Sequence, residues 1–335
     1  MSPMIFRTRR HPLAAPDLLA ERRYAYGRTA ADDGDWRTAE EMFEQALERA
    51  PDWPPALFAL GEARQRRGDA KGAAAAFRAA LAADPSDPLG ASARLALLEG
   101  TRLGALPAAY VARLFDGYAP RFDAHLTQRL ACRMPSVIAA ALEEALALTA
   151  PSDAPAFDER GRPRFASALD LGCGTGLMGE AMRRQVERLI GVDLSPRMVA
   201  EAERRAVYDD LAVGDALAFL EASAPAAFDL ILAADTFCYF GDLKPVLAAC
   251  RRALKENGLL AFSVEAFEGE GFRLKETLRF AHARAYVAEA AREAGLKRLL
   301  MQAVSTRLEA GADAPGLVCV LTMRNLRPRP TAGGR

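Results

Sequence analysis

The sequence has few of the residues that usually mark a metal centre or a disulfide framework. Only 3 histidines occur in 335 residues, and the 5 cysteines form no C-x-x-C pair. They are Cys132, Cys173, Cys238, Cys250 and Cys319. Scattered cysteines of this kind indicate buried apolar side chains in a reducing compartment rather than disulfides or a zinc site.

Net charge and long apolar runs are also missing. Lys and Arg number 44, as do Asp and Glu, so the formal net charge is +0 and nothing favours bulk attraction to nucleic acid or an anionic membrane. No apolar run reaches the roughly 18 residues of a membrane-spanning helix, and none follows Arg7, Arg9 and Arg10 as a signal sequence would. We therefore expect a cytoplasmic protein with neither a nucleic-acid nor a membrane partner. A length of 335 residues predicts about two domains.

An internal repeat organises the first hundred residues. Six residues recur 34 positions later, as Gly61, Gly68, Ala73, Phe77, Ala80 and Pro85 repeat Gly27, Gly34, Ala39, Phe43, Ala46 and Pro51. This period resembles the tetratricopeptide repeat, a pair of antiparallel helices. We predict a helical domain over residues 14–100, with two repeats and a capping helix near 89–98.

The repeats contain residues that predict where helices begin, and they give a limited indication of function. Asp35 and Asp69 precede the second helix of each repeat and are expected to cap it. Because short arrays are usually stabilised by another surface, the resemblance implies either binding of a protein partner or packing and self-association. The sequence leaves both alternatives open.

The second half alternates short apolar runs with helical patterns, which predicts a mainly parallel α/β sheet with right-handed crossovers. The last two strands have a turn and no helix between them, so they should pair antiparallel. The expected strands are residues 165–171, 188–193, 211–213, 228–233, 258–264, 299–304 and 317–323.

A glycine-rich turn follows the first of these strands. Asp170 is followed by Gly172, Gly174 and Gly176, and then a helical pattern begins. Such a turn binds the cofactor in open α/β sheets, and both NAD and S-adenosylmethionine enzymes use one. The dinucleotide spacing is out of register with the strand, and a carboxylate at Asp170 would repel a pyrophosphate but attract an ammonium group. We therefore favour S-adenosylmethionine over NAD.

The segment D-L-G-C-G-T-G at 170–176 resembles the first motif of class I S-adenosylmethionine-dependent methyltransferases. The resemblance implies that Asp193 binds the ribose hydroxyls, that Leu194 and Met198 enclose the adenine, and that Asp215 with Ala216 contacts the adenine amino group. Each aspartate alone also fits a helix N-cap. It further implies a Rossmann-like seven-stranded methyltransferase sheet with an antiparallel last strand, in a domain over residues 106–325.

An aromatic segment precedes the sheet. The pattern Phe-Asp-x-Tyr-Ala-x-x-Phe-Asp at 115–123 resembles the N-terminal helical lid of many small-molecule methyltransferases, which we place at 107–126. Aromatic residues at helical spacing also fit a simple core. On the lid interpretation, Tyr118 contacts the cofactor.

The acceptor side offers few candidate residues. The segment from Asp235 to Phe240 follows the fourth strand and should enter the crevice, where Asp235 is expected to contact the cofactor. The segment lacks the Asn/Asp-Pro-Pro-Tyr signature of amino-directed nucleic-acid methylation. Tyr239 is a candidate pocket wall or hydrogen-bond donor, and His282 a candidate base in a 272–282 segment expected to cap the substrate. A surface or helix-capping role is the alternative for His282. Glu265 and Glu268 are interpreted as solvated loop charges.

These features resemble predicted bacterial methyltransferases with tetratricopeptide repeats. The expected activity is methyl transfer from S-adenosylmethionine to an unidentified small molecule or protein. The alternative is a non-catalytic, cofactor-sensing adaptor whose repeats bind a partner.

Overall fold

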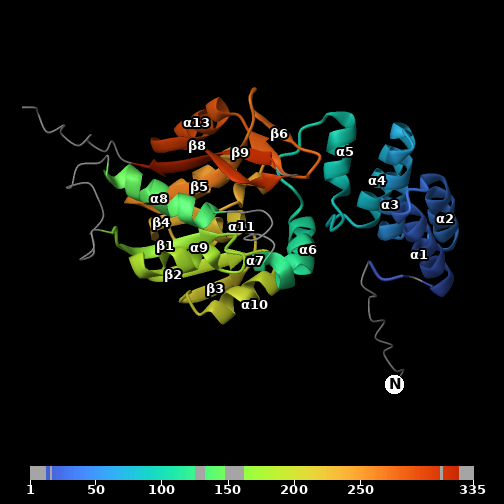
Figure 1. Cartoon of the computed structure of the whole chain (residues 1–335), viewed down its shortest axis with the longest axis horizontal. Helices are drawn as coiled ribbons and strands as arrows, with labels where there is room; N and C mark the ends of the chain where they lie inside the picture. The colour runs from blue at the N-terminus through green and yellow to red at the C-terminus, as the bar shows by residue number, and fades with distance from the viewer. Residues whose placement is uncertain (1–12, 16, 125–132, 148–161, 310–311, 324–335) are drawn as a thin grey trace, which may run out of the picture. The chain divides into compact units, whose positions relative to one another are not determined.

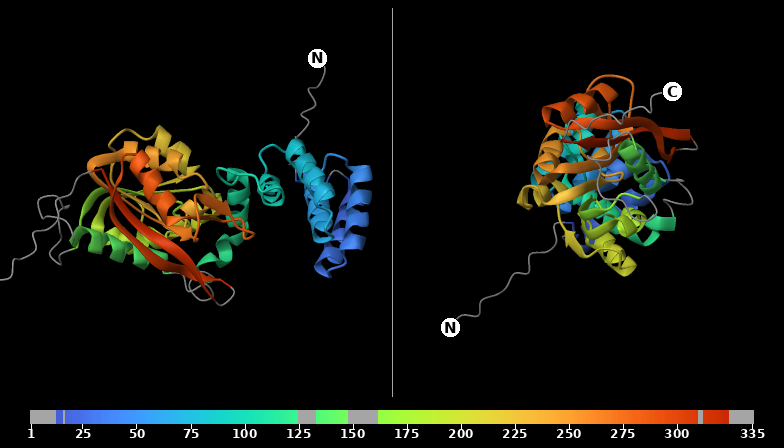
Figure 2. Two further views of the ribbon diagram at one scale, coloured as in Figure 1. Left: turned by 90° about the horizontal axis from the view of Figure 1, so that it is seen from above. Right: turned by 90° about the vertical axis from the view of Figure 1, so that its left-hand side faces the viewer.

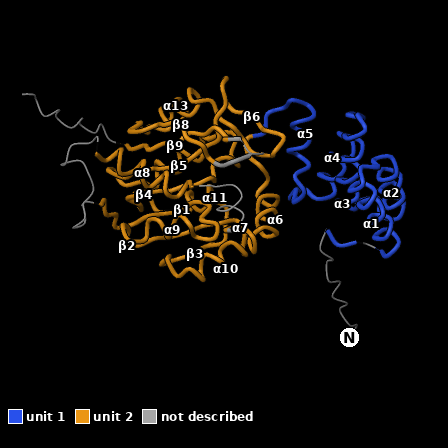
Figure 3. Tube along the Cα trace, viewed as in Figure 1, with its two compact units in different colours: residues 1–103 blue, residues 104–335 orange. Residues whose placement is uncertain are grey.

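The chain divides into two compact units, residues 1–103 and 104–335, in a computed structural model (Figures 1 and 3). The structure describes residues 13–15, 17–124, 133–147, 162–309 and 312–323. The boundary lies inside the 100–106 junction expected from the sequence. Residues 125–126 of the predicted lid and 324–325 of the predicted second domain lie outside the described residues, as does Cys132.

The first unit is built from antiparallel helices. They are α1 (Leu18–Asp32), α2 (Trp36–Arg49), α3 (Pro54–Arg66), α4 (Ala70–Ala83) and α5 (Ala91–Glu99). Consecutive helices pack against one another as two helical hairpins followed by a capping helix, as the repeat predicts.

Helix caps and close packing explain why these residues fold in this way. The side chains of Asp35 and Asp69 accept hydrogen bonds from Thr38 N and Gly72 N, which confirms both predicted N-caps. Where the two helices of the second repeat cross, the Phe77 ring lies so close to Gly61 that a Cβ there would come within 2.6 Å of it.

The second unit is a mixed sheet between two layers of helices. Its strands run in the order β3-β2-β1-β4-β5, with β9 beside β5 and β8 beside β9. The pairs among β1 to β5 are parallel, whereas β9 is antiparallel to both β5 and β8. In Figure 2, β8 and β9 form a long ribbon at one edge of the sheet. This is the predicted topology.

The strands extend further than the sequence predicts at some ends. Their bounds are β1 (Phe165–Leu171), β2 (Val186–Asp193), β3 (Asp210–Val213), β4 (Phe228–Ala233), β5 (Leu254–Ala266), β6 (Phe272–Leu274), β7 (Phe280–His282), β8 (Lys297–Glu309) and β9 (Ala312–Thr322). Two short strands are additions to the seven expected: β6 and β7 form a hairpin, and β7 pairs parallel with the end of β5.

Helices cover both faces of the sheet (Figure 1). One face packs against α8 (Met134–Ala147) and α9 (Leu177–Met182). The opposite face packs against α11 (Ala216–Ala222), α12 (Lys244–Ala253) and α13 (Arg284–Glu293). Beside β2 and β3 lies α10 (Pro196–Arg205), and it contacts α6 (Ala108–Tyr118).

Short helical segments complete the unit. They are η1 (Ala119–Arg121), α7 (Phe122–Ala124), η4 (Arg183–Gln185) and η5 (Phe237–Tyr239). The four cysteines in the described part of the chain are buried and free, as expected. None of the helices formed by the described residues has the length and apolar character needed to cross a membrane.

Replacing Gly61 by alanine should destabilise the helical unit by about 1–3 kcal/mol, because the added methyl group would overlap the Phe77 ring. Urea unfolding followed by tryptophan fluorescence measures this unit selectively, since the chain's 2 tryptophans, Trp36 and Trp53, both lie in it. The exposed Lys71→Ala variant on α4 is the control and should stay within about 0.5 kcal/mol of the parent. An unchanged unfolding midpoint for Gly61→Ala would contradict the close packing.

Candidate functional site

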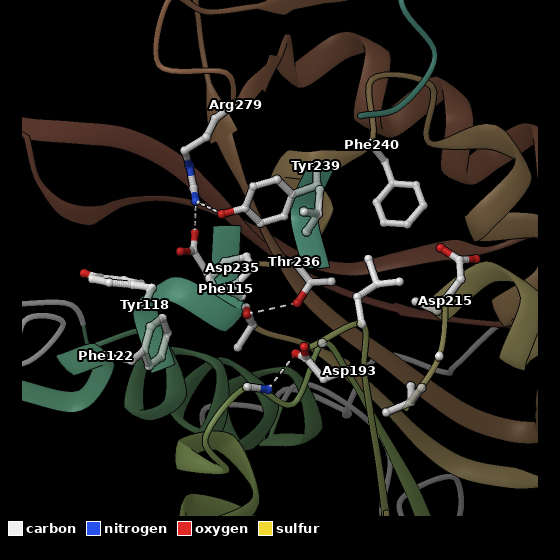
Figure 4. Close-up of a pocket in the computed structure, with 18 residues that line it drawn as sticks. Phe115, Tyr118, Phe122, Asp193, Asp215, Asp235, Thr236, Tyr239, Phe240 and Arg279 are labelled. Atoms are coloured by element: carbon white, nitrogen blue, oxygen red, sulfur yellow. Dashed lines mark hydrogen bonds and ion pairs between the residues drawn. The ribbon is translucent and has the colours of Figure 1, made fainter. Parts of the chain in front are cut away.

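A cavity opens where the parallel strands β1, β2, β3 and β4 end at one edge of the sheet (Figure 4). This is the ligand crevice of an open α/β fold. Most residues predicted from the sequence line it: Tyr118, Gly172, Gly174, Asp193, Leu194, Asp215, Ala216, Asp235 and Tyr239. Those that do not line it are Asp170, Gly176, Met198 and His282.

The glycine turn forms the floor of the cavity beside the end of β1. All three glycines have positive φ, at +66° for Gly172, +53° for Gly174 and +95° for Gly176. A Cβ at Gly172 would lie 2.4 Å from the Thr236 hydroxyl, so this position also requires glycine for space. At Gly174 a Cβ would meet only the Phe122 ring, at 3.9 Å. Apart from this ring, the space in front of Gly174 is open, and Gly174 lines the cavity.

Asp193 ends β2 and joins two turns. Its Oδ2 accepts a hydrogen bond from Gly174 N at 2.9 Å, and its Oδ1 accepts one from Ser195 N at 2.8 Å. Burial raises the pKa of Asp193 although these two amide donors lower it. The helix N-cap predicted as an alternative role falls to Ser195, which caps α10.

Asp215 combines both roles that the sequence left open. Its side chain caps α11 by accepting a hydrogen bond from Ala218 N at 2.9 Å. The same residue lines the cavity beside Gly214 and Ala216. Asp193 and Asp215 lie at one end of the cavity (Figure 4). Leu194, the residue after Asp193, also lines the cavity.

Asp170 does not reach the cavity, contrary to the sequence argument. Successive side chains of β1 point to opposite faces, and Asp170 points like Ala168 toward the layer that contains α9. It is fully buried, and its Oδ2 accepts a hydrogen bond from the Tyr208 hydroxyl at 2.6 Å. Its Oδ1 has no partner among the described residues, and burial raises the pKa of Asp170 to about 7.

Gly176 and Met198 also lie outside the cavity lining. A Cβ at Gly176 would meet Arg205 and Tyr208, which places this glycine against α10 rather than against a ligand. Met198 is fully buried. Of the two residues expected to enclose an adenine, only Leu194 therefore borders the cavity.

Aromatic side chains of α6 and α7 close the cavity from the lid side. Phe115, Tyr118 and Phe122, three residues of the predicted lid at 107–126, all line it. The Phe115 ring meets the Tyr239 ring edge-on at 5.6 Å, and the Tyr118 ring meets the Phe122 ring at 5.3 Å. These rings form an aromatic wall of the cavity.

The other end of the cavity contains a buried ionic cluster around Arg279, which sequence reasoning missed. Arg279 lies just before β7 and donates to the Tyr239 hydroxyl at 2.8 Å and to Asp235 Oδ1 (Figure 4). It also donates to Glu265 Oε1. Lys275 Nζ binds Glu265 Oε2 at 3.0 Å. Burial alone would lower the pKa of Arg279, but its acidic neighbours raise it well above the usual value.

Two predictions about this region need correction. Glu265 is not a solvated loop charge: β5 continues to Ala266, and Glu265 is only 2% exposed. His282 is neither at the surface nor in the cavity wall. Its Nε2 lies 2.9 Å from Phe240 O and 3.2 Å from Gly241 O, and burial lowers its pKa to about 4. His282 is therefore neutral at pH 7 and supports the loop after Tyr239.

Asp235 has an uncommon backbone conformation. Its φ of +57° lies in the left-handed region, which aspartate tolerates better than most residues. The turn is fixed by a hydrogen bond of 3.0 Å from Asp235 N to Ser263 Oγ and by the ion pair with Arg279. Strained residues of this kind concentrate at functional sites.

Comparison with known proteins gives two family matches. The family model described as methyltransferase domain matches residues 169–262, and that described as tetratricopeptide repeat matches residues 24–88. These matches agree with the class I methyltransferase motif and the 34-residue period found in the sequence.

Curated relatives resemble part of the chain. The ubiquinone biosynthesis O-methyltransferase of Cereibacter sphaeroides is 37% identical over 97 residues, 28% of this chain and 39% of that protein. The enzyme of the same name from Idiomarina loihiensis is 33% identical over 98 residues, 28% of this chain and 40% of that protein. The chain thus spans about two fifths of the length of these relatives.

Solved structures resemble it more distantly. The 1,6-didemethyltoxoflavin-N1-methyltransferase of Burkholderia thailandensis, solved with 1,6-didemethyltoxoflavin and S-adenosylhomocysteine, has a TM-score of 0.47 and 21% identity, covering 66% of this chain and 91% of that one. An S-adenosylmethionine-dependent methyltransferase of Clostridium acetobutylicum has a TM-score of 0.45 and 18% identity, covering 62% and 99%.

The buried Asp170 gives a pH prediction. Its pKa in the folded protein is about 7, above the ordinary 3.8, so the folded protein binds this proton more tightly than the unfolded chain. This contribution to stability is fully present below 3.8 and is lost as the pH rises through about 7. In Asp170→Asn the free energy of unfolding should fall less over that range than in the parent protein. Urea unfolding followed by circular dichroism measures this free energy at each pH. If it falls equally with pH in the variant and the parent protein, the raised pKa of Asp170 is refuted.

Proposed function

We propose that this chain, which belongs to the S-adenosylmethionine-dependent methyltransferases and carries tetratricopeptide repeats before its methyltransferase domain, transfers a methyl group to an acceptor bound near Tyr239 and Arg279. The observation that carries the proposal is the cavity itself. It joins the glycine turn and two acidic strand ends to an aromatic wall with a buried cation.

The residues of the cavity fit S-adenosylmethionine. Asp193 and Asp215 are placed to accept hydrogen bonds from the adenosine part, with Leu194 beside them. Gly174 leaves open space for the amino-acid part, since only Phe122 lies near its missing side chain. When bound, the cofactor supplies a methyl group on a positively charged sulfonium.

The charges of the lining favour this cofactor over NAD. Three carboxylates, Asp193, Asp215 and Asp235, face the cavity with one guanidinium, that of Arg279. An acidic lining attracts a cation and repels a pyrophosphate. The sequence analysis based the preference for S-adenosylmethionine over NAD on Asp170. The residues that border the cavity support this preference better than Asp170 does.

The acceptor end has groups that can orient and deprotonate an acceptor. The Tyr239 hydroxyl accepts a hydrogen bond from Arg279, which holds it in the cavity wall, where we expect it to orient an acceptor. Asp235 offers a carboxylate in the same wall, held by Arg279, as a base for a protonated acceptor. Positioning alone supplies on the order of 7 kcal/mol to reactions of this kind. Tyr239 therefore remains our candidate catalytic residue, whereas His282 becomes a supporting one.

We propose a small molecule or a protein as the acceptor. The methyltransferase family match ends at residue 262, before the β6–β7 hairpin that carries Arg279. The match thus does not extend to the residues that we propose for the acceptor. Because the curated relatives are named for ubiquinone biosynthesis, precursors of ubiquinone are one class of acceptor to test. We further propose that the tetratricopeptide repeats bind a protein partner or mediate self-association.

Calorimetric titration tests the cofactor. The protein should bind S-adenosylmethionine and S-adenosylhomocysteine but not NAD. Asp215→Asn should weaken S-adenosylmethionine binding by about tenfold through loss of one charged hydrogen-bond acceptor. The control is Asp210→Asn, an exposed aspartate on the neighbouring strand, which should bind like the parent protein. Tight NAD binding without S-adenosylmethionine binding would overturn the proposal.

Release of S-adenosylhomocysteine in the presence of fractionated lysate tests turnover. Arg279→Lys should lower turnover about tenfold or more without changing cofactor affinity, because lysine cannot bind Tyr239, Asp235 and Glu265 together. Arg273→Lys, an exposed arginine on the same hairpin, is the matched control. If no fraction supports turnover while partners still co-purify, the cofactor-sensing adaptor is the better interpretation.

A further inference from the structure

The lid segment carries two carboxylates that the proposed chemistry does not use. Asp116 lies on α6 between the cavity-lining Phe115 and Tyr118, and Asp123 follows the cavity-lining Phe122 on α7. Neither carboxylate lines the cavity. Both turn instead toward the turns after β1 and β2, where each forms hydrogen bonds.

Asp116 binds the turn after β2. The Ser195 hydroxyl donates to Asp116 Oδ1 at 2.6 Å, and Arg197 N donates to the same oxygen at 3.3 Å. The guanidinium of Arg197 also donates to the backbone oxygen of Asp116 at 3.3 Å. Ser195 is fully buried beneath this contact and caps α10.

Asp123 binds the turn after β1. The Thr175 hydroxyl donates to Asp123 Oδ1 at 2.5 Å, and Arg205 forms an ion pair with Asp123 Oδ2. The same Arg205 donates from Nε to the backbone oxygen of Thr175 at 2.6 Å. Arg205 is largely buried, with 22% of its side chain exposed, so the ion pair is partly shielded from solvent.

The two residues whose hydroxyl groups bind the lid carboxylates each follow a residue that lines the cavity. Ser195 follows Leu194, and Thr175 follows Gly174. Asp193 links the two turns, because it accepts hydrogen bonds from both Gly174 N and Ser195 N. A ligand that contacts either turn therefore lies one residue away from an attachment point of the lid.

We propose that Asp116 and Asp123 are positioning residues that fasten the aromatic lid to the two cofactor-binding turns, so that cofactor entry and release require both fastenings to open. This inference rests on the proposed function, since it takes S-adenosylmethionine as the ligand beneath the lid. Figure 1 shows α6 beside α10, the helix that carries Arg197 and Arg205, one partner of each carboxylate. The fastenings hold Phe115, Tyr118 and Phe122 against the cavity.

The release rate of radiolabelled S-adenosylmethionine, measured with an excess of unlabelled cofactor, tests the proposal. Asp116→Ala and Asp123→Ala should each release the cofactor about tenfold faster, the effect of losing hydrogen bonds to a charged group. The double variant should release it faster than either single variant. Asp116→Asn keeps an oxygen that accepts from Ser195 and should restore most of the parent rate. Leu114→Ala, 44% exposed on the same helix, is the control and should match the parent.

Tryptic cleavage after Arg113 and Arg121, both exposed in the lid, measures lid opening without cofactor. The double variant should be cleaved faster than the parent protein. If Asp123→Ala fails to fold, Thr175→Val removes the hydroxyl donor on the other side and should also speed release. If the folded double variant releases the cofactor and is cleaved at the same rates as the parent protein, the proposal that Asp116 and Asp123 hold the lid is overturned. If the parent protein binds no S-adenosylmethionine, the proposed function itself fails, and the inference with it.

Discussion

The shape of the cavity depends on one buried carboxylate, that of Asp193. It accepts hydrogen bonds from the backbone of two turns that follow adjacent parallel strands, and so it fixes the distance between them. Burial makes the charged form costly, while the amide donors favour it. The glycine turn, the N-cap of α10 and the two attachment points of the lid all lie within a few residues of these hydrogen bonds.

The two ends of the cavity are built differently. At the end that we propose for the cofactor, backbone turns and helix caps position the lining residues. At the end that we propose for the acceptor, charged side chains from three separate segments meet around Arg279. A change in the β6–β7 hairpin would therefore alter the acceptor end and leave the cofactor turns intact. The family match ends before this hairpin, which agrees with that division.

Local signals in the sequence predicted much of the fold. The repeat period, the capping aspartates and the alternation of strands and helices gave the helical hairpins and the order of the sheet. These features depend on neighbouring residues, as does the positive φ of the three glycines. The β6–β7 hairpin was missed, because strands of three residues leave little pattern to detect.

By itself, the sequence predicted the cofactor class, through the D-L-G-C-G-T-G segment at 170–176, and the strand ends where we propose that the cofactor binds. Only the tertiary structure decided which side chains face the cavity. Asp170 turned into the interior because β1 alternates its side chains between the two faces of the sheet. His282 was buried under the loop after Tyr239, while Arg279 and Glu265 met at the end of β5. Contacts between residues far apart in the chain depend on strand pairing, which no local spacing encodes.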